Sequence, residues 1–179
     1  MSDYTGQLLI SHPSLRDPNF HRTVLYLVLH EAEEGTLGLV LNRPLGRPLS
    51  ELMPQTDLGP LAECPVFVGG PVASNQLTFV EMSWDEEKQM PTVQGNLSMD
   101  DARELYLLKG DVVRAFVGHA GWTGGQLESE LESNAWLLRP PEADAFNVEH
   151  GEELWRMLIR GCGAWFELAA DEPDDPTLN

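Results

Sequence analysis

Hydrophobic residues gather in short runs separated by polar segments, and the first long runs predict strands. Residues 22–30 hold an apolar run without alternation, which is typical of a strand buried on both faces. Residues 37–41 form a second run, and the acidic segment between the two runs contains Gly35, a common turn residue. The two runs are therefore predicted to pair as an antiparallel hairpin.

The rest of the pattern predicts three shorter strands and three helices. The strands are at residues 66–68, 77–80 and 112–117, and the helices are at residues 99–108, from residue 127 onward, and at residues 152–160. Ser98 and Gly110 are typical start and stop signals for the first of these helices. Regular alternation of strand and helix is missing, so the order favours an α+β fold with a mixed, mainly antiparallel sheet over a doubly wound parallel sheet.

A glycine-rich segment, residues 118–125 (GHAGWTGG), stands between the last predicted strand and the helix after it. Its glycines and an exposed Trp122 predict a turn whose backbone N–H groups point outward and could hold a carboxylate or a phosphate. The order of residues matches neither GxxxxGK[ST] nor GxGxxG, which excludes both nucleotide-binding motifs. Alternatively, the glycines only let a tight turn pass close to a neighbouring strand, and the residue types alone favour this second interpretation.

Three charged or titratable residues are candidates for ligand contacts. Arg43, between Asn42 and Pro44 at a predicted strand end, could clamp an anion with its guanidinium, or it could pair with one of the many glutamates. His119 could transfer a proton, or it could be hydrogen-bonded within the fold. Glu128 is expected in the first turn of a helix, where interaction with the helix dipole alone would explain a carboxylate.

Net charge narrows the classes of partner. The 179 residues include 29 acidic and 11 basic side chains, which gives a formal charge of −18. Affinity for nucleic acids depends on neutralising phosphates, and the basic residues here are scattered, so direct nucleic-acid binding is disfavoured. The longest apolar run, residues 24–29, is far shorter than the roughly 20 residues of a spanning helix, so no membrane association is expected.

Cysteine and histidine content predicts neither a disulfide framework nor a metal site. Cys64 and Cys162 form no CxxC motif, and the five histidines lack the spacing of metal ligands. Two reduced thiols and a start without the features of a signal peptide favour a cytoplasmic protein with no metal or other cofactor. A single domain is expected over residues 1–170, followed by an acidic tail at residues 171–179.

Several sequence blocks, in a fixed order from one end of the chain to the other, carry a family resemblance. The blocks are residues 6–10 (GQLLI), 17–24 (DPNFHRTV), 38–45 (GLVLNRPL), 69–72 (GGPV), 121–130 (GWxxGQLExE) and 173–179 (PDDPTLN). With these blocks the chain resembles the YqgE/AlgH family. The resemblance implies a small cytosolic bacterial protein with an α+β fold, in which helices surround a bifurcated, partly barrel-like sheet.

The resemblance implies less about activity. The AlgH branch is described as a candidate transcriptional regulator of alginate production, and the family offers no established catalytic residues to transfer. Val28 and Leu29 stand where many relatives carry a cysteine, which weakens a thiol-redox role for this chain. Gly124 stands where relatives often have proline, so a looser turn is expected there.

Two functional hypotheses follow, and a purely structural role in an assembly is a third. The first is a regulatory or adaptor protein that binds a protein partner or a small molecule and affects gene expression indirectly. The alternative is an enzyme for a small anionic metabolite, with Arg43 as the anchor and His119 or Glu128 moving a proton. Residues 42–44, 69–72 and 118–128 are expected to form a single recess. The candidate ligand-binding residues are Asn42, Arg43, Gly69, Gly70, His119, Gly121, Trp122, Gln126 and Glu128.

Overall fold

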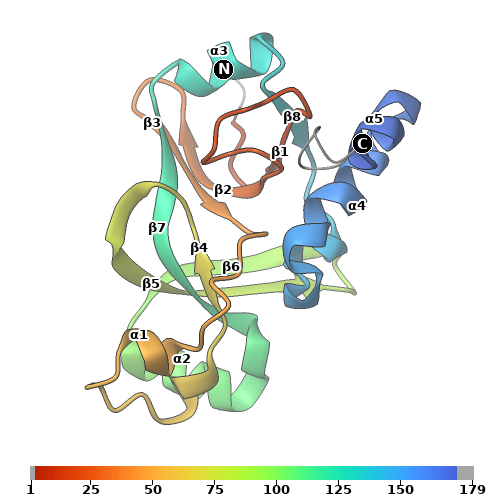
Figure 1. Ribbon diagram of the computed structural model, residues 1–179. Coiled ribbons are helices and arrows are strands. Elements are labelled where there is room, and N and C mark those ends of the chain that lie inside the picture. The colour runs from red at the N-terminus through yellow and green to blue at the C-terminus, as the bar shows by residue number, and fades with distance from the viewer. Residues whose placement is uncertain (1–2, 173–179) are drawn as a thin grey trace.

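The computed structural model describes residues 3–172 and contains one branched sheet with helices at its ends and along one side (Figure 1). The strands are β1 (Leu8–Ser11), β2 (Val24–Glu31), β3 (Gly35–Val40), β4 (Val66–Val68), β5 (Val72–Asp85), β6 (Met90–Leu97), β7 (Val113–Thr123) and β8 (Trp136–Arg139). The α-helices are α1 (Leu49–Leu52), α2 (Met99–Lys109), α3 (Gln126–Glu132), α4 (Leu154–Arg160) and α5 (Ala164–Ala170). The 3-10 helices are η1 (Gly59–Glu63), η2 (Gly110–Val112), η3 (Ala143–Phe146) and η4 (Val148–Glu153).

The sheet has the order β6-β5-β7-β3-β2-β1-β8, and β4 pairs with β7 outside this path. The β4–β7 pair is parallel and the pairs along the main path are antiparallel. The sheet branches at β7, because its first half lies between β4 and β5 while its second half pairs with β3. The prediction of an α+β fold with a bifurcated, mainly antiparallel sheet is therefore confirmed. The sheet does not close into a barrel, since β6 and β8 form its two ends.

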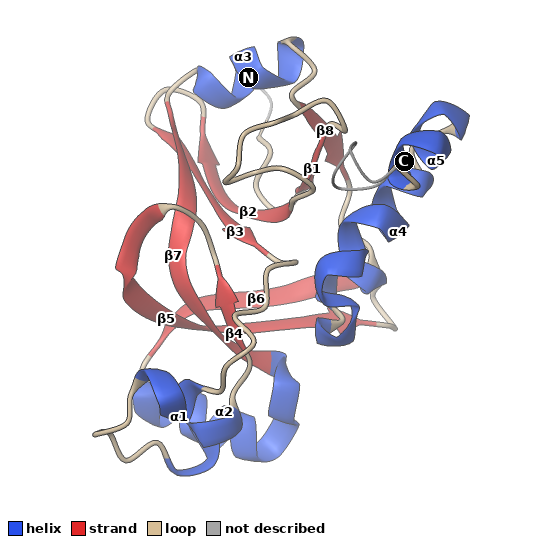
Figure 2. Cartoon of the chain, in the orientation of Figure 1, coloured by secondary structure: helices blue, strands red, loops and turns tan. Residues whose placement is uncertain are grey.

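Helices cover three separate parts of this sheet (Figure 2). One end is covered by α1 and α2, the opposite end by α3, and one side by α4 and α5. Three hydrophobic clusters correspond to these covers: one contains Trp155 of α4, the second Leu61 of η1 with Ala102 of α2, and the third Leu127 of α3. Each helix group thus buries its own apolar face, which is the main driving force for its docking.

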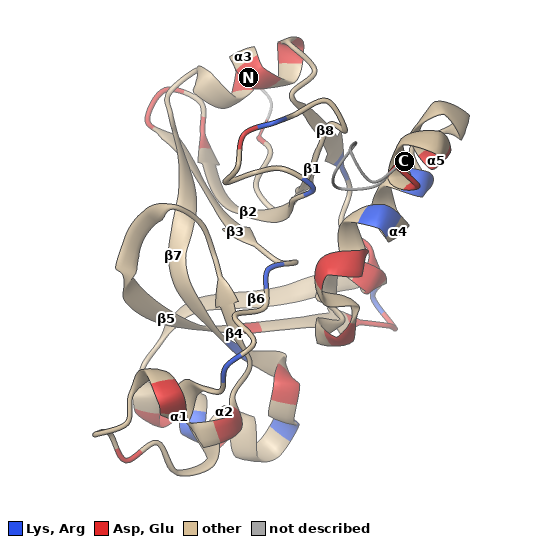
Figure 3. Cartoon of the chain, in the orientation of Figure 1, with Lys and Arg blue, Asp and Glu red and all other residues tan. Residues whose placement is uncertain are grey.

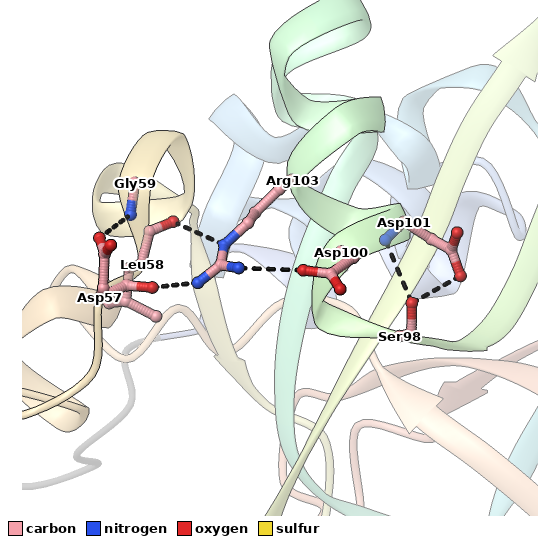
Figure 4. Close-up of polar contacts among 7 residues, drawn as sticks. All are labelled: Asp57, Leu58, Gly59, Ser98, Asp100, Asp101 and Arg103. Atoms are coloured by element: carbon pink, nitrogen blue, oxygen red, sulfur yellow. Dashed lines mark hydrogen bonds and ion pairs between the residues drawn. The ribbon is translucent and has the colours of Figure 1, made fainter.

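The helix predicted at residues 99–108 is α2, and its capping residue is the predicted one. Ser98 accepts a hydrogen bond from the backbone N–H of Asp101, which satisfies one of the free donors of the first turn (Figure 4). Arg103 extends from the same helix toward η1 and donates to the carbonyl oxygens of Asp57 and Leu58. Its guanidinium therefore joins α2 to the segment just before η1.

The hairpin predicted from the first two apolar runs is present as β2 and β3. Its register runs from Leu25 opposite Val40 to Glu31 opposite Gly35, with a bulge in between. The predicted burial on both faces holds only for the first half of β2, because Leu29 is exposed. Strands β1, β6 and β8 and helix α5 were not predicted, and β5 is far longer than residues 77–80. Pro91 and Gly95 interrupt the alternating pattern by which β6 could have been predicted. Both residue types are tolerated there because β6 is an edge strand.

The glycine-rich segment is mostly strand, so the prediction of a turn over residues 118–125 is wrong. Strand β7 continues through Thr123, and the turn is confined to residues 124–125. The glycines allow close backbone approach: a Cβ atom on Gly70 would lie 2.2 Å from the carbonyl carbon of His119, and one on Gly118 would lie 2.5 Å from the carbonyl oxygen of Gly70. Trp122 is buried rather than exposed. The alternative interpretation, close passage past a neighbouring segment, is the one that the contacts support.

Both cysteines are free thiols, and they differ in accessibility. Cys64 is fully buried, and this burial raises the pKa of its thiol to about 12. Cys162 is only partly buried, and burial also raises its pKa. Within residues 3–172, no helix is long and apolar enough to cross a membrane and no three His, Cys, Asp or Glu side chains are grouped as a metal site would need.

The thiol environments predict selective alkylation. At pH 8, iodoacetamide is expected to modify Cys162 at least about tenfold faster than Cys64, because the thiolate is the reacting species and Cys64 is both shielded and protonated. Peptide mapping by mass spectrometry after a time course measures both rates, and urea should make them equal. Equal rates in the native chain would contradict the buried position of Cys64.

Candidate functional site

A pocket of about 400 Å³ lies where the segment that leads into β2, the loop after β3 and the end of β4 meet η4 and α4. Its lining residues are His21, Arg22, Asn42, Arg43, Pro44, Val68, Glu152 and Arg156. Basic residues are few on this acidic molecule, and Figure 3 shows some of them on the loop after β3 and on α4, on either side of this region. Three of the nine arginines in the chain line this one pocket.

Arg43 is held by contacts with the segment that leads into β2. Its Nη2 donates to Thr23 Oγ1 at 3.0 Å and to the carbonyl oxygen of His21 at 3.3 Å. Partial burial lowers the pKa of Arg43, while the carboxylates of Asp17 and Glu152 act in the opposite direction. The guanidinium is thus oriented by neutral oxygen atoms, and further donors remain on the same group for a planar anion.

Asn42 has a structural role beside it. Its side-chain oxygen accepts the backbone N–H of Val24 at 2.9 Å, and its side-chain nitrogen donates to the carbonyl oxygen of Arg22 at 2.9 Å. Asn42 is buried, and both ends of its amide are used in fixing the chain where β2 begins. Asn42 therefore positions two arginines: Arg43, which follows it in the sequence, and Arg22, whose carbonyl oxygen it contacts.

Arg22 has an unusual backbone conformation. Its φ of 49° lies in the left-handed region, which bulky residues adopt rarely and at a cost of about 1–3 kcal/mol. Its guanidinium lies 5.2 Å from the centre of the Trp155 ring, and its Nη2 donates to the carbonyl oxygen of Glu172. Trp155 is itself fixed, because its indole N–H donates to the carbonyl oxygen of Ser11 at 2.9 Å. The strained residue is therefore held on a rigid aromatic surface at the pocket.

Arg156 completes the cationic lining from α4. It forms an i,i+3 ion pair with Glu153 at 2.9 Å, and the carboxylate of this pair is the more exposed partner. Glu152 contributes the one acidic group of the lining. Three guanidinium groups and one carboxylate thus line the pocket, with the carboxylates of Asp17 and Glu153 close to Arg43 and Arg156.

The candidate ligand-binding residues at 69–70 and 118–121 take part in backbone packing and strand pairing. Gly69 and Gly70 provide the close crossing over β7, and the N–H of Gly69 donates to the carbonyl oxygen of Val117 at 2.8 Å. His119 and Gly121 lie within β7, opposite Val72 of β5 and Leu37 of β3. Main-chain donors in this region are thus used in the sheet.

Trp122, Gln126 and Glu128 belong to the contacts of α3. Trp122 and Gln126 both donate to the carboxylate of Glu130, at 2.9 and 3.0 Å. Glu128 lies 3.4 Å from the buried imidazole of His30, near the far end of the β2–β3 hairpin. These three side chains therefore stabilise the packing of α3 on the sheet.

The structure does not bring Arg43, His119 and Glu128 into one pocket, so the expected convergence is wrong. Asn42, next to Arg43, bonds to Val24 at the start of β2, whereas Glu128 contacts His30 six residues further along. Six residues of extended strand span about 20 Å. His119 is likewise not part of the lining that contains Arg43. The enzyme hypothesis loses its geometric basis.

Of the three segments expected to share a recess, residues 69–72 lie beside both of the others, because they also cross the start of the 118–128 segment at Gly118 and His119. The N–H of Val68 donates to the carbonyl oxygen of Arg43, and that of Val40 donates to the carbonyl oxygen of Gly69, so residues 42–44 and 69–72 lie beside each other. The pocket itself is completed by residues that sequence reasoning missed, Arg22 and Arg156 above all. Arg22 lies within the DPNFHRTV block, which was the only signal that could have singled it out.

Comparisons with known proteins agree on the identity of the fold and the family. The AlgH-like family model matches residues 8–167. A UPF0301 protein of Streptomyces coelicolor is 35% identical over 193 residues, covering 100% of this chain and 97% of the relative. A UPF0301 protein of Ralstonia nicotianae is 37% identical over 169 residues, covering 89% and 88%.

Two solved structures are similar over nearly the whole chain. The solution structure of the AlgH protein from Pseudomonas aeruginosa has a TM-score of 0.66 and 29% identity, covering 97% of both chains. The crystal structure of protein DIP2367 from Corynebacterium diphtheriae has a TM-score of 0.72 at 21% identity, covering 94% of this chain and 92% of that one, and it supports the fold alone. From the family model and the relatives together, the chain belongs to the AlgH-like family.

Proposed function

We propose that this chain is a regulatory or adaptor protein that binds a small anionic ligand in the pocket lined by Arg22, Arg43 and Arg156, hereafter the arginine pocket. The observation that carries the proposal is the gathering of three guanidinium groups in one cavity of a strongly acidic chain. A general excess of basic residues cannot account for this gathering. The strained backbone of Arg22 gives independent support, because such strain is often retained at functional sites.

The chemistry of the lining favours an organic phosphate or a polycarboxylate as the ligand class. Guanidinium groups bind both kinds of anion through paired N–H donors. A cavity of about 400 Å³ suits a small molecule. Glu152 lies in the same lining and can accept a hydrogen bond from a hydroxyl or an amine of that ligand.

A regulatory effect on gene expression would then be indirect. The net charge of −18 opposes association with a phosphate backbone, and the first turn of α2 carries Asp100 and Asp101 rather than basic residues. Ligand binding at the arginine pocket would instead change the surface presented to a protein partner, through α4 and the strand ends that form the lining.

A thermal-shift screen tests this proposal. A panel of phosphorylated metabolites and di- and tricarboxylates is expected to contain a compound that raises the melting temperature of the full chain. Arg43→Ala and Arg156→Ala should each weaken binding of that compound about 10- to 100-fold, because each removes a charge-assisted hydrogen bond.

The matched control is Arg16→Ala, which removes the same charge from an exposed position outside the lining. Its affinity should stay within about twofold of the original, as expected for a screened surface charge. The proposal fails if no anion stabilises the chain, or if Arg16→Ala weakens binding as much as Arg43→Ala does.

A further inference from the structure

His21 lies in the lining of the arginine pocket, and its imidazole ring is held in one orientation. Its Nδ1 atom lies 3.0 Å from the carbonyl oxygen of Leu15. A carbonyl oxygen only accepts hydrogen bonds, so in the neutral ring Nδ1 carries the proton and Nε2 carries a lone pair. Leu15 is outside the lining, and within residues 3–172 no hydrogen bond engages Nε2. The nucleophilic nitrogen is thus the one that remains for a ligand of the pocket.

The backbone of His21 is fixed as firmly as its ring. Its N–H donates to the carbonyl oxygen of Asp17 at 2.7 Å. Its carbonyl oxygen accepts hydrogen bonds from Thr23 Oγ1 at 3.2 Å and from Arg43 Nη2 at 3.3 Å. The last of these bonds joins the histidine directly to one of the guanidinium groups of the pocket. Imidazole and guanidinium are therefore positioned together, which is what a reaction between a bound anion and a side chain requires.

We propose that His21 is a phosphorylation site, and that its Nε2 atom takes the phosphoryl group of a small acyl phosphate bound in the arginine pocket. This inference rests on the proposed function, because the arginines that bind the anion would also hold the phosphoryl oxygens. Histidine is among the side chains that form covalent intermediates, and arginines stabilise a phosphoryl group during transfer. An acyl phosphate requires the least from the pocket, since its leaving group is a carboxylate and departs without a proton.

The transfer needs no other reactant. The lone pair of Nε2 forms the N–P bond, the P–O bond to the acyl group breaks, and the electron pair of that bond leaves with the carboxylate. The proton on Nδ1 stays in place. Its hydrogen bond to the carbonyl oxygen of Leu15 stabilises the positive charge that the ring gains. The products are a phosphohistidine and a carboxylate, and the total charge is unchanged.

Phosphorylation and anion binding would then exclude each other. A phosphoryl group on His21 is strongly negative and would lie in the same cavity as the guanidinium groups of Arg43 and Arg156. It would occupy the position that a free anion needs. A regulatory protein would in this way gain a covalent state that outlasts the departure of the small molecule, and a protein partner could recognise that state.

Incubation of the full chain with acetyl phosphate, followed by peptide mapping by mass spectrometry at neutral pH, tests the inference. His21 is expected to be phosphorylated at least about tenfold faster than any other histidine, because the pocket holds the donor beside it. The other histidines are internal controls, and they lie among the described residues but outside the lining: His12, His30, His119 and His150.

Variants of the pocket add a second measurement. Arg43→Ala and Arg156→Ala should each slow the phosphorylation of His21 about 10- to 100-fold, because each removes a group that neutralises the phosphoryl oxygens. Arg16→Ala, outside the lining, should leave the rate within about twofold. His21→Asn should abolish the modification at this position, since asparagine has no nucleophilic ring nitrogen.

Comparison with the thermal-shift panel distinguishes failure of this inference from failure of the proposed function. If an anion of the panel stabilises the chain but His21 is phosphorylated no faster than the other histidines, the inference is overturned and the proposed function stands. If no anion binds and His21 is not phosphorylated, both are overturned. Selective phosphorylation of His21 that Arg43→Ala and Arg156→Ala do not slow would also overturn the inference, because the pocket would then play no part in the transfer.

Discussion

A Gly70→Ala variant is expected to lose at least about 4 kcal/mol of unfolding free energy, a large part of the stability of a domain of this size. The added Cβ would lie 2.2 Å from the carbonyl carbon of His119 and 2.3 Å from the backbone nitrogen of Ala120. Both contacts are with backbone atoms of β7, so no side chain can rotate away to relieve them. The φ of +153° at Gly70 adds backbone strain for any other residue.

Urea denaturation followed by circular dichroism measures this loss, and Gly95→Ala is the matched control. A Cβ on Gly95 meets no atom within 4 Å, and Gly95 has no positive φ, so its substitution should change stability by less than about 1 kcal/mol. If Gly70→Ala unfolds at the same urea concentration as Gly95→Ala, the close crossing of the β4–β5 connection over β7 is wrong. The same crossing explains why the glycines occur in these two segments.

This crossing also shows where sequence reasoning stops. The β2–β3 hairpin and α2 were predictable because their signals are local: two apolar runs around a turn, and Ser98 as a cap. The continuation of β7 beyond Val117 was not, because four glycines in eight residues are the usual composition of a turn. What makes the segment a strand is its pairing with β3 and β5, whose residues lie far away in the sequence.

The residues of the arginine pocket were likewise predictable only in part. Arg43 was predictable as a candidate, because a lone guanidinium between Asn42 and a proline at a strand end is unusual in an acidic chain. Arg22 and Arg156 were not, since one depends on a left-handed backbone conformation and the other on the docking of α4. Glu128 and His119 were plausible partners by residue type alone. The structure shows that Glu128 and Arg43 lie at opposite ends of the β2–β3 hairpin, which residue types cannot reveal.

Replacement of Glu130 by alanine is expected to cost about 2–5 kcal/mol of unfolding free energy, because each buried donor left unpaired costs about 1–3 kcal/mol. Glu130 Oε2 accepts the indole N–H of Trp122 at 2.9 Å and that of Trp136 at 2.7 Å. The two tryptophans are 6% and 3% exposed, so water cannot replace the lost acceptor without a rearrangement. Gln126 would lose its bond to the other carboxylate oxygen as well.

Glu132→Ala provides the comparison, since Glu132 is an exposed residue of the same short helix and its loss should change stability by less than about 0.5 kcal/mol. Urea titration monitored by tryptophan fluorescence reports both stability and the indole environment. Equal midpoints for the two variants would mean that both indoles find other acceptors. A large difference would show that one carboxylate of α3 joins β7 to β8, and that Trp122 and Gln126 stand near it for the stability of the fold rather than for a ligand.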